Sequence, residues 1–128
     1  MLQAMASGHP GSLATIHAET PRLALKRLAL WALMALPGVT ESYIADWIAS
    51  TIDIVVQLNY HQPTGLHYVS SVAEIDGRED EVPRLQELWC RPGHDQRLRW
   101  KGRHSKLEER FESAGVDWSP PPTEDHQL

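Results

Sequence analysis

The sequence has little cysteine and no long apolar run. Its single cysteine, Cys90, excludes a disulfide within the chain and is typical of a reducing compartment, so a cytoplasmic location is expected. The longest apolar run covers residues 28–36. A membrane-spanning helix requires roughly 20 apolar residues. We therefore expect a buried amphipathic helix there and no membrane span.

The chain has fewer basic than acidic residues, 12 against 17, so the formal net charge is −5 and the pI is near 5.7. This negative net charge argues against electrostatic binding of a polyanion by the chain as a whole, and no nucleic acid is expected as a partner. Three interpretations of the one basic patch stay open: a nucleic-acid contact, a solvated strand face, and a subunit contact that answers the acidic residues 79–81. The patch surrounds Trp100 and consists of Arg97, Arg99, Lys101, Arg103, His104 and Lys106.

Helix signals dominate the first half of the chain. Thr20-Pro21 predicts a helix start, because threonine caps free N–H groups and proline at the first helical position loses no hydrogen bond. Pro37-Gly38 predicts its end, and Thr40 predicts the cap of a second helix. Before them, the alternation of residues 12–17 predicts a short strand. The apolar stripe of the second helix comprises Ile44, Trp47, Ile48 and Thr51.

Strand signals dominate the second half, where β-branched residues and alternating patterns recur between turns. The order of elements is typical of an α/β core with an antiparallel β-rich appendage. The expected strands cover residues 52–58, 66–75, 82–89 and 97–100, with a hairpin turn at 63–65 and a polar loop at 76–81.

A short helix is predicted near the end of the chain. Ser105 and Glu108 form the capping-box pattern S-x-x-E, and Gly115 stands where a helix terminator belongs. Residues 119–128 hold three consecutive prolines and acidic side chains, a composition that predicts a disordered tail.

Residues 8–18 read Gly-His-Pro-Gly-Ser-Leu-Ala-Thr-Ile-His-Ala. This stretch resembles the histidine box of type II/IV secretion-system ATPases, in particular the CpaF/TadA-like pilus motors, whose pattern is close to M-x-T-G-H-x-G-S-x-x-T-x-H-A. Ser7 stands where the family usually has threonine. The resemblance covers roughly residues 1–117 in one order. It continues through residues 21–28, 48–58, 72–75 and 107–116.

The resemblance implies the C-terminal portion of a RecA-like P-loop ATPase domain with an antiparallel β-rich appendage. Residues 1–75 would belong to the ATPase core, residues 76–118 to strands and a closing helix, and residues 119–128 to the tail. It implies a motor that powers type II/IV secretion or Flp/Tad-type pilus assembly, is a homo-hexamer and binds an inner-membrane platform protein. The expected location is then cytoplasmic and peripheral to the inner membrane.

The resemblance also implies site residues. By this match His17 is the sensor of the terminal phosphate, and Arg22 and Arg27 are phosphate or inter-subunit contacts. A lone histidine is more often an ordinary surface or core residue, and the two arginines can equally be the solvated side of a helix. The residues that would shape the nucleotide site are Gly8, His9, Gly11, Ser12 and Thr15.

Residues that phosphoryl transfer requires are missing from these 128 positions. The phosphate cradle G-x-x-x-x-G-K-[ST] does not occur, and the acidic strand end that positions magnesium and water is absent as well. ATP and Mg²⁺ are expected in a complete family member, and this chain alone is expected to bind neither and to be inactive. Two origins follow: a severed gene product, or a half-motor that joins another chain. The alternative function is a non-catalytic interaction subunit of the secretion machine.

The sequence indicates neither a metal site nor a catalytic triad. Cys90 and His94 have the C-x3-H spacing of half a zinc site, but no second pair with suitable spacing accompanies them, so no metal site is expected. No Ser-His-Asp or Cys-His arrangement is indicated by the sequence.

Overall fold

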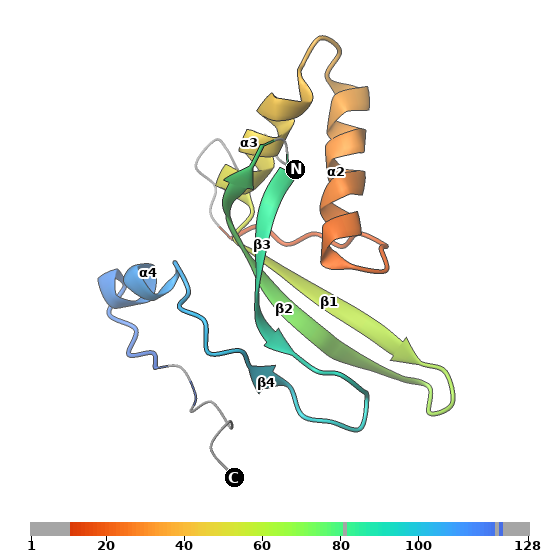
Figure 1. Ribbon diagram of the computed structural model, residues 1–128, viewed down its shortest axis with the longest axis vertical. Coiled ribbons are helices and arrows are strands. Elements are labelled where there is room, and N and C mark those ends of the chain that lie inside the picture. Colours follow the sequence, from red (N-terminus) through yellow and green to blue (C-terminus); the bar gives the residue numbers. More distant parts are fainter. Residues whose placement is uncertain (1–10, 81, 120, 122–128) are drawn as a thin grey trace. The chain divides into compact units, whose positions relative to one another are not determined.

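The computed structural model describes residues 11–80, 82–119 and 121 (Figure 1). Gly8, His9 and most of the predicted tail lie outside these residues. The described part is an α/β structure with three helices and one antiparallel sheet in the order β1-β2-β3-β4, so the α/β class and the antiparallel β-rich part are confirmed. The elements are α2 (Pro21–Ala35), α3 (Glu41–Thr51), β1 (Ile54–His61), β2 (Leu66–Glu79), β3 (Val82–Cys90), β4 (Arg99–Trp100) and α4 (Glu108–Ser113).

The chain divides into two compact units, each with its own packing. Unit 1 comprises Met1–Val55 and Ile75–Leu85, and unit 2 comprises Val56–Glu74 and Gln86–Leu128. Long strands therefore contribute one part of their length to each unit.

Threonine caps begin both helices of unit 1, as predicted. The hydroxyl oxygen of Thr20 accepts a hydrogen bond from the backbone N–H of Leu23 at 3.2 Å. The hydroxyl oxygen of Thr40 accepts one from the backbone N–H of Tyr43, also at 3.2 Å. Each cap satisfies one of the N–H groups that a helix start leaves without a partner. Helix α2 ends at Ala35, just before the predicted Pro37-Gly38.

The core of unit 1 lies between the two helices and strand β2. Helices α2 and α3 lie side by side in Figure 1 and contact each other. Ile44, Ile48 and Ile75 are fully buried, and the predicted stripe of α3 is thereby confirmed at its two isoleucines. The buried cluster consists of Leu25, Leu28, Ile44, Ile48 and Ile75.

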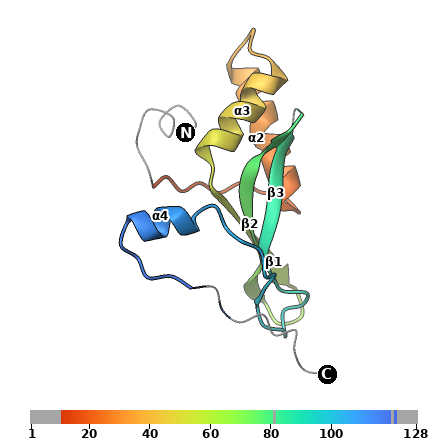
Figure 2. The same cartoon turned by 60° about the vertical axis from the view of Figure 1, so that its left-hand side comes forward.

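The predicted strand at residues 12–17 is wrong. Residues 11–18 are irregular and lead into α2, as Figure 2 shows for the part in red and orange. A strand needs a neighbour for its backbone N–H and C=O groups, and the four strands of the described sheet do not include this segment. Ile16 instead packs against the helical cluster.

The predicted hairpin turn is confirmed, and the strand after it is longer than predicted. The backbone N–H of Gly65 donates to the carbonyl of His61 at 2.9 Å, which closes the turn. Strand β2 then runs to Glu79, so the predicted loop at 76–81 is wrong for residues 76–79. Arg84 stabilises this part by donating to the backbone carbonyl of Asp76 at 2.9 Å and to its carboxylate at 2.7 Å. The polar residues 76–79 therefore form the exposed end of a strand and not a loop.

Aromatic rings pack the lower part of unit 2. Trp89 and Trp100 are register partners on β3 and β4, with ring centroids 5.2 Å apart. Trp118 contacts Trp100 at 6.0 Å and Phe111 at 5.8 Å, so residues on both sides of α4 join the cluster. The predicted third strand is confirmed, and the fourth is confined to Arg99–Trp100.

Gly115 ends helix α4 as predicted. Its φ of +71° is in the left-handed region that favours glycine. The backbone N–H of Val116 donates to the carbonyl of Phe111 at 2.9 Å, and that of Gly115 donates to Glu112 at 3.0 Å. This pair of bonds is the Schellman motif.

Within the described part of the chain, none of the helices combines the length and the apolar character that crossing a bilayer demands.

The unit 1 core predicts a large effect of one truncation. Ile48→Ala should lower the free energy of unfolding by about 2–5 kcal/mol, because it leaves a cavity at a fully buried position. Chemical denaturation followed by circular dichroism measures this. Met34→Ala on the same helix pair is the control, since Met34 is 74% exposed. Equal losses in the two variants would contradict this placement of the core.

Candidate functional site

The described part of the histidine box is an exposed segment in front of helix α2. Gly11 has a φ of +91°, in the left-handed region that favours glycine. Ser12, Thr15 and His17 are all exposed. No hydrogen bond joins these three side chains to one another or to another described residue, so the structure does not assemble them into a closed site.

Arg27 and His17 are brought together by the fold. The Arg27 guanidinium donates a hydrogen bond to the backbone carbonyl of His17, which ties the end of the box segment to helix α2. The imidazole itself stays exposed. Arg22 lies five residues earlier on α2, is exposed, and forms no ion pair with a described carboxylate. Arg27 is thus a positioning contact for the segment, whereas Arg22 keeps the character of a solvated helix residue.

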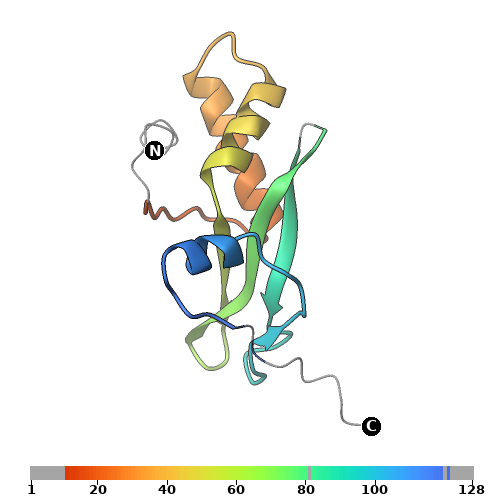
Figure 3. The same cartoon turned by 90° about the vertical axis from the view of Figure 1, so that its left-hand side faces the viewer.

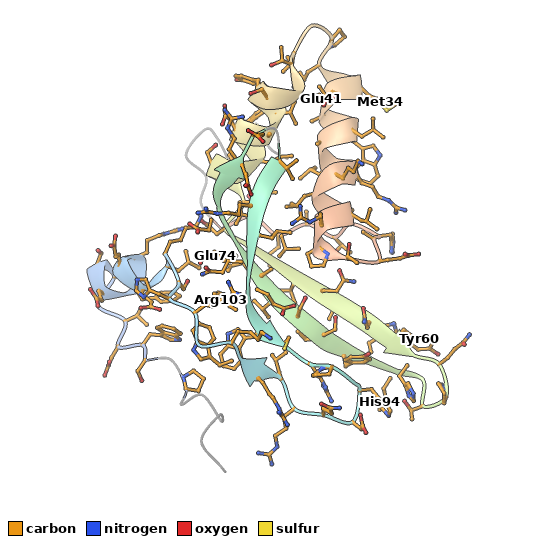
Figure 4. The ribbon with its side chains drawn as sticks, viewed as in Figure 1. Met34, Glu41, Tyr60, Glu74, His94 and Arg103 are labelled. Carbon is orange, nitrogen blue, oxygen red and sulfur yellow. The ribbon has the colours of Figure 1, made fainter. Side chains whose placement is uncertain are left out.

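The most buried charge was not predicted from the sequence. Glu74 on β2 is 0% exposed and belongs to unit 2, and Figure 4 labels it beside the stretch before α4 of the same unit. Its carboxylate accepts a hydrogen bond from the Ser105 hydroxyl at 2.9 Å and one from the backbone N–H of Lys106 at 3.3 Å. A buried charge without such partners would be very costly. Glu74 is therefore a structural anchor for the residues before α4.

The capping box at Ser105 is confirmed in one half only. The Glu108 carboxylate accepts a hydrogen bond from the backbone N–H of Ser105 at 2.9 Å, as the S-x-x-E pattern predicts. The Ser105 hydroxyl, however, donates to Glu74 and accepts from the backbone N–H of Leu107 at 3.2 Å. The Nδ1 atom of His104 also lies 2.6 Å from the Glu108 carboxylate. A single glutamate inside an apolar strand, Val72 to Ile75, was the sequence signal for this network.

A histidine stack occupies one end of unit 2. The rings of His61 and His94 lie 3.4 Å apart between centroids and 8° from parallel. His61 also contacts the Thr64 hydroxyl at 2.8 Å. The hairpin turn and the loop before β4 lie at the same end of this unit in Figure 3. The stack holds these two loops together.

The loop before β4 is further fixed by Arg91. Its guanidinium donates to the backbone carbonyls of Gly93, at 3.1 Å, and of His94, and it lies 5.2 Å above the Tyr68 ring. His94 is therefore engaged by His61 and not by Cys90. Across the described residues, no group of three or more histidine, cysteine, aspartate or glutamate side chains is arranged to hold a metal ion.

One open depression lies on unit 1, lined by Ser42, Arg78, Asp80 and Val82. The Arg78 guanidinium binds neighbouring side chains. It contacts the Asp46 carboxylate at 2.5 Å and donates a hydrogen bond to the Ser42 hydroxyl at 3.0 Å. These bonds fasten β2 to α3 inside unit 1. The depression thus presents a structural ion pair, and the exposed box segment remains the candidate functional site.

No protein-family model matches this sequence, and a search of curated proteins finds no match either.

The Glu74 network predicts a stability effect at Ser105. Ser105→Ala removes one of the donors to a fully buried carboxylate, so the free energy of unfolding should fall by about 1–3 kcal/mol. Urea denaturation measures the change. Ser113→Ala is the matched control, because the exposed Ser113 hydroxyl bonds only within its own helix, and its effect should stay within about 0.5 kcal/mol. An unchanged stability of Ser105→Ala would show that Glu74 does not depend on this donor.

Proposed function

We propose that this chain is the C-terminal part of a motor ATPase that powers type II/IV secretion or Flp/Tad-type pilus assembly. The resemblance of residues 8–18 to the histidine box carries the proposal. The exposure of Ser12, Thr15 and His17 supports it, because these side chains are accessible to a phosphate held on another segment or subunit. The fold would then be the C-terminal portion of a RecA-like P-loop domain.

His17 is the proposed phosphate sensor. An imidazole donates a hydrogen bond to a phosphate oxygen and loses that partner when the phosphate leaves. Arg27 holds the backbone of His17 on α2, so a shift of the histidine is passed to the helix. Helix α2 in turn packs on α3 through Leu25 and Leu28. Rigid packed helices are suitable elements for passing a local change to a whole unit.

The cofactors follow from the same proposal. ATP and Mg²⁺ would bind in the complete motor, whose phosphate cradle is not among these 128 residues. The motor would be a homo-hexamer, located in the cytoplasm, peripheral to the inner membrane and docked on a platform protein there. Nucleotide binding by this chain alone is not expected.

A second candidate is a non-catalytic subunit that joins a separate motor chain. One observation favours it: the described residues form a packed core, and none of their buried side-chain N or O atoms lacks a hydrogen-bond partner. Buried polar groups of natively packed proteins are almost always hydrogen-bonded in this way.

A C-terminal affinity tag on the chromosomal gene separates these candidates. The protein is purified from its own cells, and the captured polypeptides are sequenced by mass spectrometry. The first candidate predicts that G-x-x-x-x-G-K-[ST] lies on the same polypeptide as residues 8–18. The second predicts that motif on a different, co-purifying polypeptide. Capture of neither would refute both candidates.

The sensor role predicts a selective loss of activity. In the captured motor, His17→Ala should lower kcat for ATP hydrolysis by roughly 10–150-fold, the rate equivalent of a lost hydrogen bond of about 1.5–3 kcal/mol to a charged group. His67→Ala is the control, because His67 is also exposed but lies on β2 outside the box. A kcat for His17→Ala that equals that of the control would exclude His17 as the sensor.

A further inference from the structure

Four cations of unit 2 form an exposed stripe, which we call the basic stripe. It consists of Arg97, Arg99, Lys101 and Arg103, all exposed, with no ion pair to a carboxylate of any described residue. Pairing with strand β3 places two of these cations, Arg99 and Lys101. Arg99 is opposite Cys90 in the register, and the backbone N–H of Lys101 donates to the carbonyl of Leu88 at 2.8 Å. Leu98 and Trp100, between them, are half-buried.

Trp100, the aromatic residue within the basic stripe, already packs against other aromatic rings of unit 2. Trp100 contacts Trp89 at 5.2 Å and Trp118 at 6.0 Å between ring centroids. Proteins that bind single-stranded nucleic acid combine basic grooves with aromatic faces on which bases stack. Here the cations point outward and the indole packs inward, so the stripe offers charge without a stacking platform. Its arrangement fits an acidic protein surface better than a nucleic-acid strand.

Unit 1 carries the complementary charge at the turn between β2 and β3. We call Glu79 and Asp80 the acidic turn. Glu79 and Asp80 are exposed, and no described cation pairs with either carboxylate. The nearby arginines are already committed, since Arg78 pairs with Asp46 at 2.5 Å and Arg84 pairs with Asp76 at 2.7 Å. The acidic turn therefore has negative charge available for a partner.

We infer that the basic stripe of one copy of this chain docks on the acidic turn of a second copy. The two surfaces differ, so the contact is head to tail, and repetition of such a contact gives a ring or an open chain. The inference deepens the proposed function by naming the contact between subunits, and it rests on that function for the expectation of a ring. The contact itself rests on the exposed charges of residues 79–80 and of Arg97, Arg99, Lys101 and Arg103.

The simplest other role for the stripe is to protect a sheet edge. Strand β4 is the last strand in the sheet order, and charged side chains at an edge discourage pairing with other strands. That role is compatible with the inferred contact, because side chains and not the backbone edge would hold the partner. Exposed ion pairs are individually weak. Association should therefore need several of them together and should weaken steeply as salt rises.

Two charge-reversal variants test the contact by sedimentation velocity in about 50 mM salt, where the Debye length exceeds 10 Å. The stripe variant is Arg97→Glu with Arg99→Glu, and the turn variant is Glu79→Lys with Asp80→Asn. Asparagine is chosen because Asp80 has a φ of +53°, which asparagine tolerates. The wild-type chain should form concentration-dependent oligomers. Each variant alone should associate at least about tenfold more weakly, since like charges then face each other.

Mixing the two variants gives the sharpest result. Each variant keeps one unaltered surface, and the two reversed surfaces carry opposite charges, so the mixture should associate more strongly than either variant alone. Lys26→Glu, an exposed charge reversal on α2, should associate like the wild type. Circular dichroism confirms that each variant is folded. The inference is overturned if the wild type stays monomeric, if each variant alone associates like the wild type, or if the mixture associates no more strongly than either variant alone.

Two further readouts keep this test separate from the proposed function. Binding of single-stranded RNA or of anionic vesicles by a monomeric wild type, lost in the stripe variant, would overturn the inference in favour of that polyanion. Normal head-to-tail association without a phosphate cradle among the captured polypeptides would support the contact and refute the motor. Capture of a polypeptide with the phosphate cradle, without association through these two surfaces, would support the motor and refute the contact.

Discussion

The apolar cluster that joins helices α2 and α3 to strand β2 is the constraint on which unit 1 depends. Ile44, Ile48 and Ile75 are fully buried there, and Leu25 and Leu28 complete the cluster. The same helix that supplies the two leucines holds His17 through the Arg27 guanidinium. The exposed box segment is therefore placed by the core behind it, and any role of His17 depends on that packing.

Strand β2 serves both units with neighbouring residues. Ile75 belongs to the apolar cluster of unit 1, whereas Glu74 belongs to unit 2 and accepts hydrogen bonds from Ser105 and the backbone of Lys106. An apolar anchor and a satisfied buried carboxylate thus follow each other along one strand. A buried charge stabilises little by itself, but its requirement for matched donors restricts how the segment before α4 can pack. Such a restriction specifies one arrangement of the chain.

Local signals predicted the helices well, because a cap or a terminator acts within a few residues. Thr20, Thr40 and Gly115 were all identified from sequence and have the expected geometry. The prediction of a strand at residues 12–17 was wrong, because an alternating pattern alone does not provide a neighbouring strand for backbone hydrogen bonds. The contacts of Glu74 and His94 were not predictable, because their partners lie far along the chain or depend on loop geometry. At the candidate site the residues were named from sequence, whereas the bond between Arg27 and His17 required the structure.

The central claim is that the exposed box segment responds to nucleotide. Hydrogen–deuterium exchange over residues 11–18, in the complex captured from the protein's own cells, tests it most directly. A phosphate contact at His17 should slow amide exchange in this segment when a non-hydrolysable ATP analogue is bound, compared with ADP. Residues 66–70 on β2, outside the box, provide the internal reference. Identical exchange of residues 11–18 in both nucleotide states would contradict the claim.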